Sequence, residues 1–203
     1  MKLIKVGENQ KKLIALDLSV DKTLDVILAG ENAEVEVVGL VLGTGTDERS
    51  LDANIVHAAP NTKSNVNVRA VLKNRSTFAF RGMVRIENGA KGSDAYLRSD
   101  ALLFDDAKMG DDTPALEILE QDVKAGHAAT VGKVDEQMIF YLMSRGLSRS
   151  QAEKMLIQGF INPIQEKLGK PARSYFGTSD SVRKRAKERS LAGDNGGDLI
   201  VKS

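Results

Sequence analysis

The chain has 203 residues, with 29 Lys and Arg against 28 Asp and Glu, so its formal net charge is +1 at pH 7. Hydrophobic residues make up 41% and charged residues 28%, a balance typical of a folded globular chain and not of a disordered one. This length allows one domain, or two small ones, with a substantial core. The balanced charge excludes a global electrostatic attraction to nucleic acid or to an anionic membrane.

The residue types that are rare or absent exclude several kinds of functional site. The chain has no cysteine, so it supplies no disulfide, no thiol nucleophile and no thiolate metal ligand. Two histidines and no tryptophan argue against a multi-histidine zinc centre and against platforms for base stacking. The start lacks the apolar stretch of a signal peptide, and the longest apolar run, residues 35–45, is too short to span a bilayer. We therefore expect a cytoplasmic protein with no nucleic-acid or membrane partner.

From residue 10 to about residue 130 the sequence shows short apolar runs and no long helical period. Several runs alternate apolar and polar residues, as strands with one buried face do. The predicted strands are Leu24–Leu28, Glu34–Leu42, Ala53–Ala58, Asn65–Leu72, Thr77–Glu87, Ala95–Leu103 and Ala115–Leu119. Turn signals separate them at residues 29–32, 43–45, 60–61, 87–89 and 109–112.

Short strands without intervening helices fit either a β-sandwich or a β-solenoid. Two features favour the solenoid. The connections are irregular, and polar residues recur beside the strands, where stacked coils can pair them. These residues are Asn54, Asn65, Asn67 and Asp94. A sandwich remains the alternative on the pattern alone.

The period of the apolar residues changes after residue 133. Asp135 is a good N-cap, apolar residues follow at helical spacing, and Gly146 fits the position just past a helix end. Ser148 and Gln151 form the capping box of a second helix. We expect Pro163 to break or kink that helix and to restart it.

These patterns divide the chain into three parts. Residues 1–133 are predicted to form the β-solenoid and residues 134–175 a helical domain, with Gly169 as the stop after the restarted helix. Residues 176–203 are predicted to be a basic, flexible tail.

The residues alone indicate no evident active site. His127 lies among small residues, where a ligand or a partner can reach the imidazole, although a packing role is equally compatible with them. His57, close to a Pro-Asn turn, is more typical of a structural histidine. The carboxylate pairs Asp105-Asp106 and Asp111-Asp112 are predicted to lie in solvated turns. The glycines of residues 39–46 lack the context of a phosphate-binding loop and are also predicted to form a turn.

Six short segments match the sequence patterns of one family, in the same order along residues 50–165. They are His57–Ser64, Phe80–Ile86, Ala90–Tyr96, Pro114–Ile118, Asp122–Glu136 and Phe140–Gly146. Together they resemble the SufB/SufD family of iron–sulfur cluster assembly proteins. The resemblance implies a right-handed parallel β-helix with a C-terminal α-helical hairpin, in agreement with the strand-then-helix pattern.

The resemblance also implies a function. It indicates a non-enzymatic scaffold subunit that binds a SufC-type ABC ATPase through its helical domain. It further indicates pairing through the β-helix, as a homodimer or as a heterodimer with a SufB/SufD homologue. The larger N-terminal region common in the family is expected to be missing or reduced.

One departure from the family concerns its Cys-Ser-His motif. Ala125 stands where the motif has cysteine, so the thiolate sulfur acceptor of the SufB branch is not in this chain. His127 keeps the histidine of the SufD branch and is the candidate for a cluster or iron site shared with a partner chain. We expect no cofactor to be bound by this chain alone, and a transient iron–sulfur cluster to form in the assembled complex.

The helical hairpin carries more apolar residues than one packed stripe requires, so a partner is expected to cover the remainder. With the resemblance, the candidate contacts of the ATPase are Phe140, Tyr141, Arg145, Met155 and Phe160. In the alternative, the surplus packs against the β-domain or a second copy of the chain.

Two other functions are compatible with a β-helix. One is a carbohydrate-active enzyme, although six Phe and three Tyr are few for a sugar-stacking groove. The other is a homo-oligomeric paralogue that only binds partners.

Overall fold

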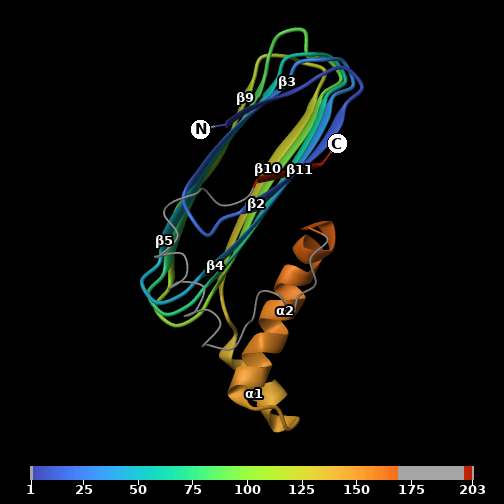
Figure 1. The fold of residues 1–203 in the computed structure, drawn as a ribbon. Helices are drawn as coiled ribbons and strands as arrows, with labels where there is room; N and C mark the ends of the chain where they lie inside the picture. The colour runs from blue at the N-terminus through green and yellow to red at the C-terminus, as the bar shows by residue number, and fades with distance from the viewer. Residues whose placement is uncertain (1, 169–198, 203) are drawn as a thin grey trace.

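The computed structural model describes residues 2–168 and 199–202, and within them the chain winds as a parallel β-solenoid followed by two helices (Figure 1). One five-stranded sheet, which we call sheet A, contains β1 (Lys2–Val6), β3 (Lys22–Leu28), β5 (Glu48–His57), β7 (Thr77–Ile86) and β9 (Lys108–Ile118). Sheet B contains β2 (Lys11–Asp17), β4 (Glu34–Gly43), β6 (Lys63–Leu72), β8 (Asp94–Leu103) and β10 (Lys124–Lys133), with β11 (Leu199–Lys202) antiparallel to β2.

Successive coils stack in register, so equivalent residues form columns along the solenoid. Leu28, His57 and Ile86 occupy one such column in sheet A. Hydrogen bonds between exposed side chains of neighbouring coils join residues 29 apart, as from Asn54 to Asp25 and from Arg81 to Asp52. The alternate residues that face the lumen between the sheets are buried and form one continuous core.

The turns between the sheets also stack in columns. Asn32 and Asn61 adopt positive φ, as does Gly92 in the next coil, and the backbone N–H of each donates to a carbonyl one coil further on. A Cβ on Gly92 would lie 2.4 Å from Oδ1 of Asn61, so this turn requires glycine in two ways.

The helices begin where the sequence predicts. Helix α1 (Glu136–Ser144) is capped by Asp135, whose carboxylate accepts a hydrogen bond from the backbone N–H of Gln137, and Gly146 follows it with a φ of 93°. Helix α2 (Arg149–Leu168) has the predicted capping box, because Ser148 and Gln151 each accept a hydrogen bond from the backbone N–H of the other.

Of the break or kink predicted at Pro163, the break is wrong, because α2 runs through Pro163 to Leu168, and the kink stays a prediction. Packing holds the helix together across the proline. Ile157 and Ile161 before it and Ile164 after it are buried against the outer face of sheet B. Gly169 lies outside the described residues.

Helix α2 lies along the outer face of sheet B, as Figure 1 shows. Its isoleucines pack on apolar residues that include Val38, Val71 and Phe104. The ion pair between Lys73 and Glu153, at 2.6 Å, adds to this contact. The hairpin is thereby attached to one sheet, while α1 extends beyond it.

The predicted parallel β-helix with a following helical hairpin is confirmed. Four of the described strands were not predicted: β1, β2, β10 and β11. The turn predicted at residues 109–112 is wrong, since these residues belong to β9, and residues 39–43 lie in β4 and not in a turn. The basic part of the predicted tail lies outside the described residues, and residues 199–202 form β11.

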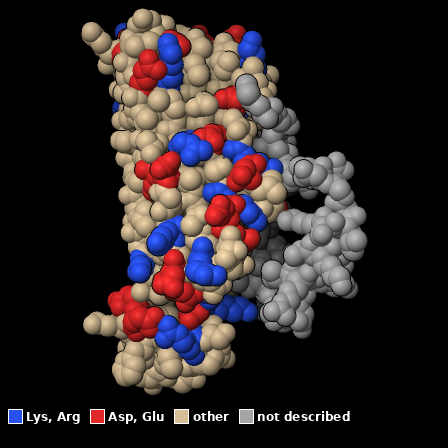
Figure 2. All heavy atoms as spheres, turned by 90° about the vertical axis from the view of Figure 1, so that its left-hand side faces the viewer, with Lys and Arg blue, Asp and Glu red and all other residues tan. Residues whose placement is uncertain are grey.

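The outer faces carry both signs of charge. Arg81 of β7 pairs with Asp52 at 2.6 Å and with Asp111 at 3.6 Å, and Arg85 pairs with Glu117. Figure 2 shows this side of the molecule with basic and acidic groups intermixed. Among the described helices, none has the length and apolar character needed to cross a membrane.

Candidate functional site

His127 lies on β10, the last strand of sheet B, at the end of the solenoid that faces away from β1. It is in register with Leu97 of β8, which is fully buried in the lumen core. The same register therefore points the imidazole toward the lumen. His127 is nevertheless exposed, because no further coil covers β10 within the described residues.

This end of the solenoid, which we call the open end, is formed by β9 and β10. Each is the outermost strand of its sheet. Ile118 continues the buried column of Ile86 but is 44% exposed, and Val131 continues that of Ala101 but is 49% exposed. Apolar side chains that belong to core columns thus face outward here, together with strand edges that no other strand of the described residues pairs.

Ala125, at the position of the family's cysteine, also lies in a lumen-facing column, in register with Ala95. It is partly buried against the core. Ala125 and His127 are two residues apart on one strand and so share a face of β10. The structure brings the two positions singled out by the sequence together at the open end.

The predicted ATPase contacts divide into two groups. Phe140 is 72% exposed, and Tyr141 and Met155 are also well exposed, while the Arg145 guanidinium lies 5.3 Å from the centre of the Tyr141 ring. These four residues remain available to a partner.

Phe160 is less exposed than the other four predicted contacts. Its ring is partly buried against sheet B and lies 5.2 Å from the Arg69 guanidinium, which also donates a hydrogen bond to its backbone carbonyl. Phe160 therefore contributes to docking α2 on the solenoid. The hairpin therefore leaves fewer apolar side chains uncovered than the sequence indicates.

His57 has the structural role that its sequence context predicts. It is fully buried, with Nδ1 2.8 Å from the Thr62 hydroxyl and Nε2 2.8 Å from the Ser64 hydroxyl. Burial lowers the pKa of His57 from its ordinary value of 6.5 to about 4, against the opposing effect of Asp94. His57 is therefore neutral at pH 7 and ties one coil to the next turn.

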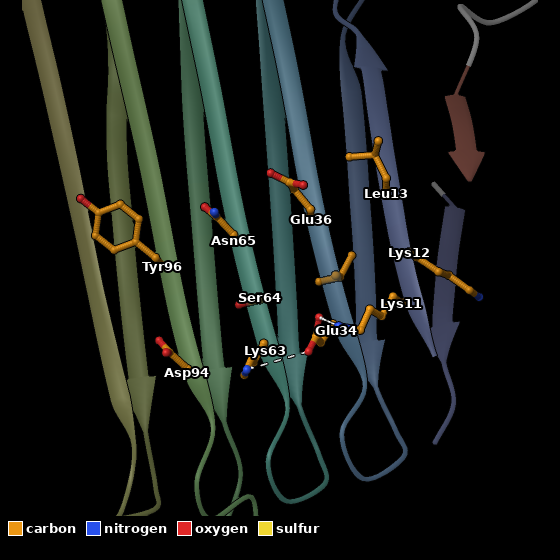
Figure 3. Close-up of a pocket in the computed structure, with 11 residues that line it drawn as sticks. Lys11, Lys12, Leu13, Glu34, Glu36, Lys63, Ser64, Asn65, Asp94 and Tyr96 are labelled. Carbon is orange, nitrogen blue, oxygen red and sulfur yellow. Dashed lines mark ion pairs between the residues drawn. The ribbon is translucent and has the colours of Figure 1, made fainter. Parts of the chain in front are cut away.

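A groove of about 550 Å³ runs over the outer face of sheet B (Figure 3). Lys11, Glu34, Lys63 and Asp94 stand in one row across four strands. Glu34 pairs with Lys11 at 2.8 Å and with Lys63 at 3.9 Å. Positive and negative side chains alternate along this row, so their charges cancel and the groove does not favour a ligand of one charge.

Within residues 2–168 and 199–202, no group of three or more His, Asp or Glu side chains is arranged to hold a metal ion. His127 on its own is an incomplete site. Any metal or cluster bound at the open end needs ligands from elsewhere.

Comparison with known proteins gives one consistent result. The family described as "SUF system FeS cluster assembly, SufBD core domain" matches residues 17–160, from the end of β2 to within α2. An iron–sulfur cluster assembly SufBD family protein of Mycobacterium tuberculosis is 39% identical over 143 residues. The iron–sulfur cluster assembly protein SufB of Bacillus subtilis is 34% identical over 142 residues.

Both matches cover 70% of this chain, but only 17% of the mycobacterial protein and 30% of the Bacillus protein. The chain thus spans less than a third of the length of these relatives. The family match takes in the solenoid of this chain from the end of β2, all of α1 and the first part of α2. The carbohydrate-enzyme alternative is not favoured by these similarities.

Proposed function

This chain belongs to the SufBD family of iron–sulfur cluster assembly proteins, and we propose that it is a non-enzymatic scaffold subunit whose open end forms one half of a cluster assembly site. The observation that carries the proposal is the position of His127. The family's motif segment forms β10 and turns its histidine toward an uncovered lumen. The iron–sulfur cluster is the cargo of this site and not a resident cofactor.

A second SufBD chain is the proposed cover of the open end. Two exposed strand edges and the apolar residues Ile118 and Val131 favour burial against another solenoid end. Because this chain has no cysteine, thiolate ligands for a cluster must come from the partner. We therefore favour a cysteine-containing homologue over a second copy as the productive partner, with His127 contributing a neutral imidazole.

A SufC-type ABC ATPase is the proposed partner of the helical hairpin. Phe140 and Tyr141 of α1, the helix that extends beyond sheet B, are exposed, as is Met155 of α2, and the Arg145 guanidinium lies over the Tyr141 ring. Aromatic residues, methionine and arginine are enriched in protein interfaces. ATP hydrolysis is assigned to that partner and not to this chain.

Co-purification tests both contacts. The tagged chain is expressed with a SufC-type ATPase and a cysteine-containing SufBD homologue, and the captured proteins are quantified. The double variant Phe140→Asp/Met155→Asp should lose the ATPase but keep the homologue, with circular dichroism confirming the fold. Lys154→Asp is the matched control, because it changes an exposed α2 residue that is not one of the proposed contacts.

If the double variant captures as much ATPase as the wild type does, the docking surface is wrong. If neither partner is captured by the wild-type chain, the scaffold proposal itself is contradicted.

A further inference from the structure

A carboxylate interrupts the lumen core at the open end. Asp112 of β9 is in register with Phe80 of β7, which follows Leu51 of β5 in the same column. Phe80 and Leu51 are both fully buried. The lumen column of Leu51 and Phe80 therefore continues with the carboxylic acid Asp112. The sequence pattern predicts a solvated turn at this residue, but it lies in strand β9.

The burial of the Asp112 carboxylate is poorly compensated. Both of its oxygens are buried, and among the described residues the Ser99 side chain is the one hydrogen-bonding group that favours its charged form. Its neighbour Asp111 is different: that side chain is exposed on the outer face and pairs with Arg81. A buried carboxylate with so little compensation destabilises a fold, and an apolar side chain at this position would not.

The electrostatics agree with this position. Burial raises the pKa of the Asp112 carboxyl, with Asp100 acting in the same direction and the Ser99 side chain opposing the shift. Ser99 is a buried lumen residue of β8. The Asp112 carboxyl group therefore faces the inside of sheet B.

The position of Ser99, beside Asp112, shows where Asp112 lies relative to His127. It is in register with Ala129 of β10, which is two residues from His127 on the same face of that strand. One strand spacing and one two-residue step place His127 about 8 Å from Ser99 between Cα atoms. Asp112 and His127 thus lie on the two walls of the same open lumen end.

We propose that Asp112 is a second ligand of this site, which together with His127 holds ferrous iron at the open end for cluster assembly. The inference rests on the proposed function and deepens it. Imidazole and carboxylate are established ligands of divalent iron, and ligation by Asp112 requires its buried side chain to turn toward the opening. The remaining ligands come from the partner chain, so the site is incomplete until the solenoids pair.

The test compares Asp112→Asn with Asp111→Asn, a matched change of the adjacent residue. Co²⁺, which substitutes for Fe²⁺ and absorbs visible light when coordinated, is titrated into the chain alone and into the complex with the homologue. Asp112→Asn and His127→Ala should each weaken Co²⁺ binding at least tenfold. Asp111→Asn should bind Co²⁺ as the wild type does.

Stability gives a second, independent readout. Asp112→Asn should raise the urea midpoint of the purified chain by roughly 0.5 M, because it removes a buried charge, while Asp111→Asn should not raise it. If Asp112→Asn is both more stable than the wild type and a weaker metal binder, Asp112 is a ligand that lowers the stability of the fold. If Asp112→Asn fails to fold, Asp112→Ser replaces it in both measurements.

Unchanged Co²⁺ affinity in Asp112→Asn overturns this inference, and it leaves the scaffold function standing if the complex still forms. If the wild-type complex does not form, the proposed function is contradicted together with this inference, because the site needs ligands from the partner. Loss of binding in both aspartate variants alike also overturns it, because that result reports surface charge and not ligation.

Discussion

Acidification should destabilise the protein through one buried side chain, His57. Its pKa is about 4 in the folded chain and 6.5 when the ring is in water. The unfolded state therefore takes up the proton first as the pH falls, so the contribution of neutral His57 is complete above pH 6.5 and is lost below it. With about 1.4 kcal/mol for each pKa unit, the free energy of unfolding should fall by about 2 kcal/mol at pH 5 and about 3 kcal/mol at pH 4.

The variant His57→Leu isolates this effect. At pH 7.5 it should be less stable by about 1–3 kcal/mol, because the Thr62 and Ser64 hydroxyls each lose a partner. Its stability should lack the wild-type loss between pH 6.5 and pH 4, as measured by urea unfolding followed by circular dichroism. His127→Ala is the control, since it removes an exposed imidazole. Parallel curves for wild type and His57→Leu over this range would refute the reasoning.

Two further predictions concern the turn columns and the docked helix. In thermal unfolding, Gly92→Ala should lower stability by about 1–2 kcal/mol, because φ is positive there and the added Cβ meets Asn61. The control Gly132→Ala has open space around the added Cβ and should change stability by no more than about 0.5 kcal/mol. Equal effects at the two glycines would contradict the turn geometry. Ile161→Ala should cost about 2–4 kcal/mol in urea unfolding, because Ile161 is fully buried between α2 and sheet B, and a wild-type midpoint would contradict that docking.

The fold was predictable wherever the local sequence and the tertiary contacts agree. The alternating residues of β6 and β7 and the caps at Asp135 and Ser148 indicate their structures without further information. Strand β10 did not follow from its sequence, because alanine, glycine and histidine are weak strand formers. There the stacking on β8 determines the conformation. The break predicted at Pro163 is wrong for the same reason, since packing of α2 on sheet B outweighs the tendency of proline to end a helix.

The candidate site was predictable only in part. The motif resemblance singles out His127, but only the register of β10 with β8 shows that it faces the lumen, which no further coil covers within the described residues. Asp112 could not be found from the sequence. Its Gly-Asp-Asp context is typical of a turn, and its inward position depends on the irregular register between β7 and β9 around Phe78 and Phe80. The packing of Phe160 on sheet B also could not be found from the sequence, because apolar spacing is the same for a docked ring and a free one.

The most direct measurement of the proposed function is the iron and acid-labile sulfide content of the complex. The chain, a cysteine-containing SufBD homologue and a SufC-type ATPase are co-expressed and purified without oxygen, and both elements are quantified for each complex. The wild-type complex should carry iron and sulfide together, and both should fall sharply when the chain is omitted or carries His127→Ala. Equal loading of the homologue and the ATPase without this chain would contradict a scaffold role.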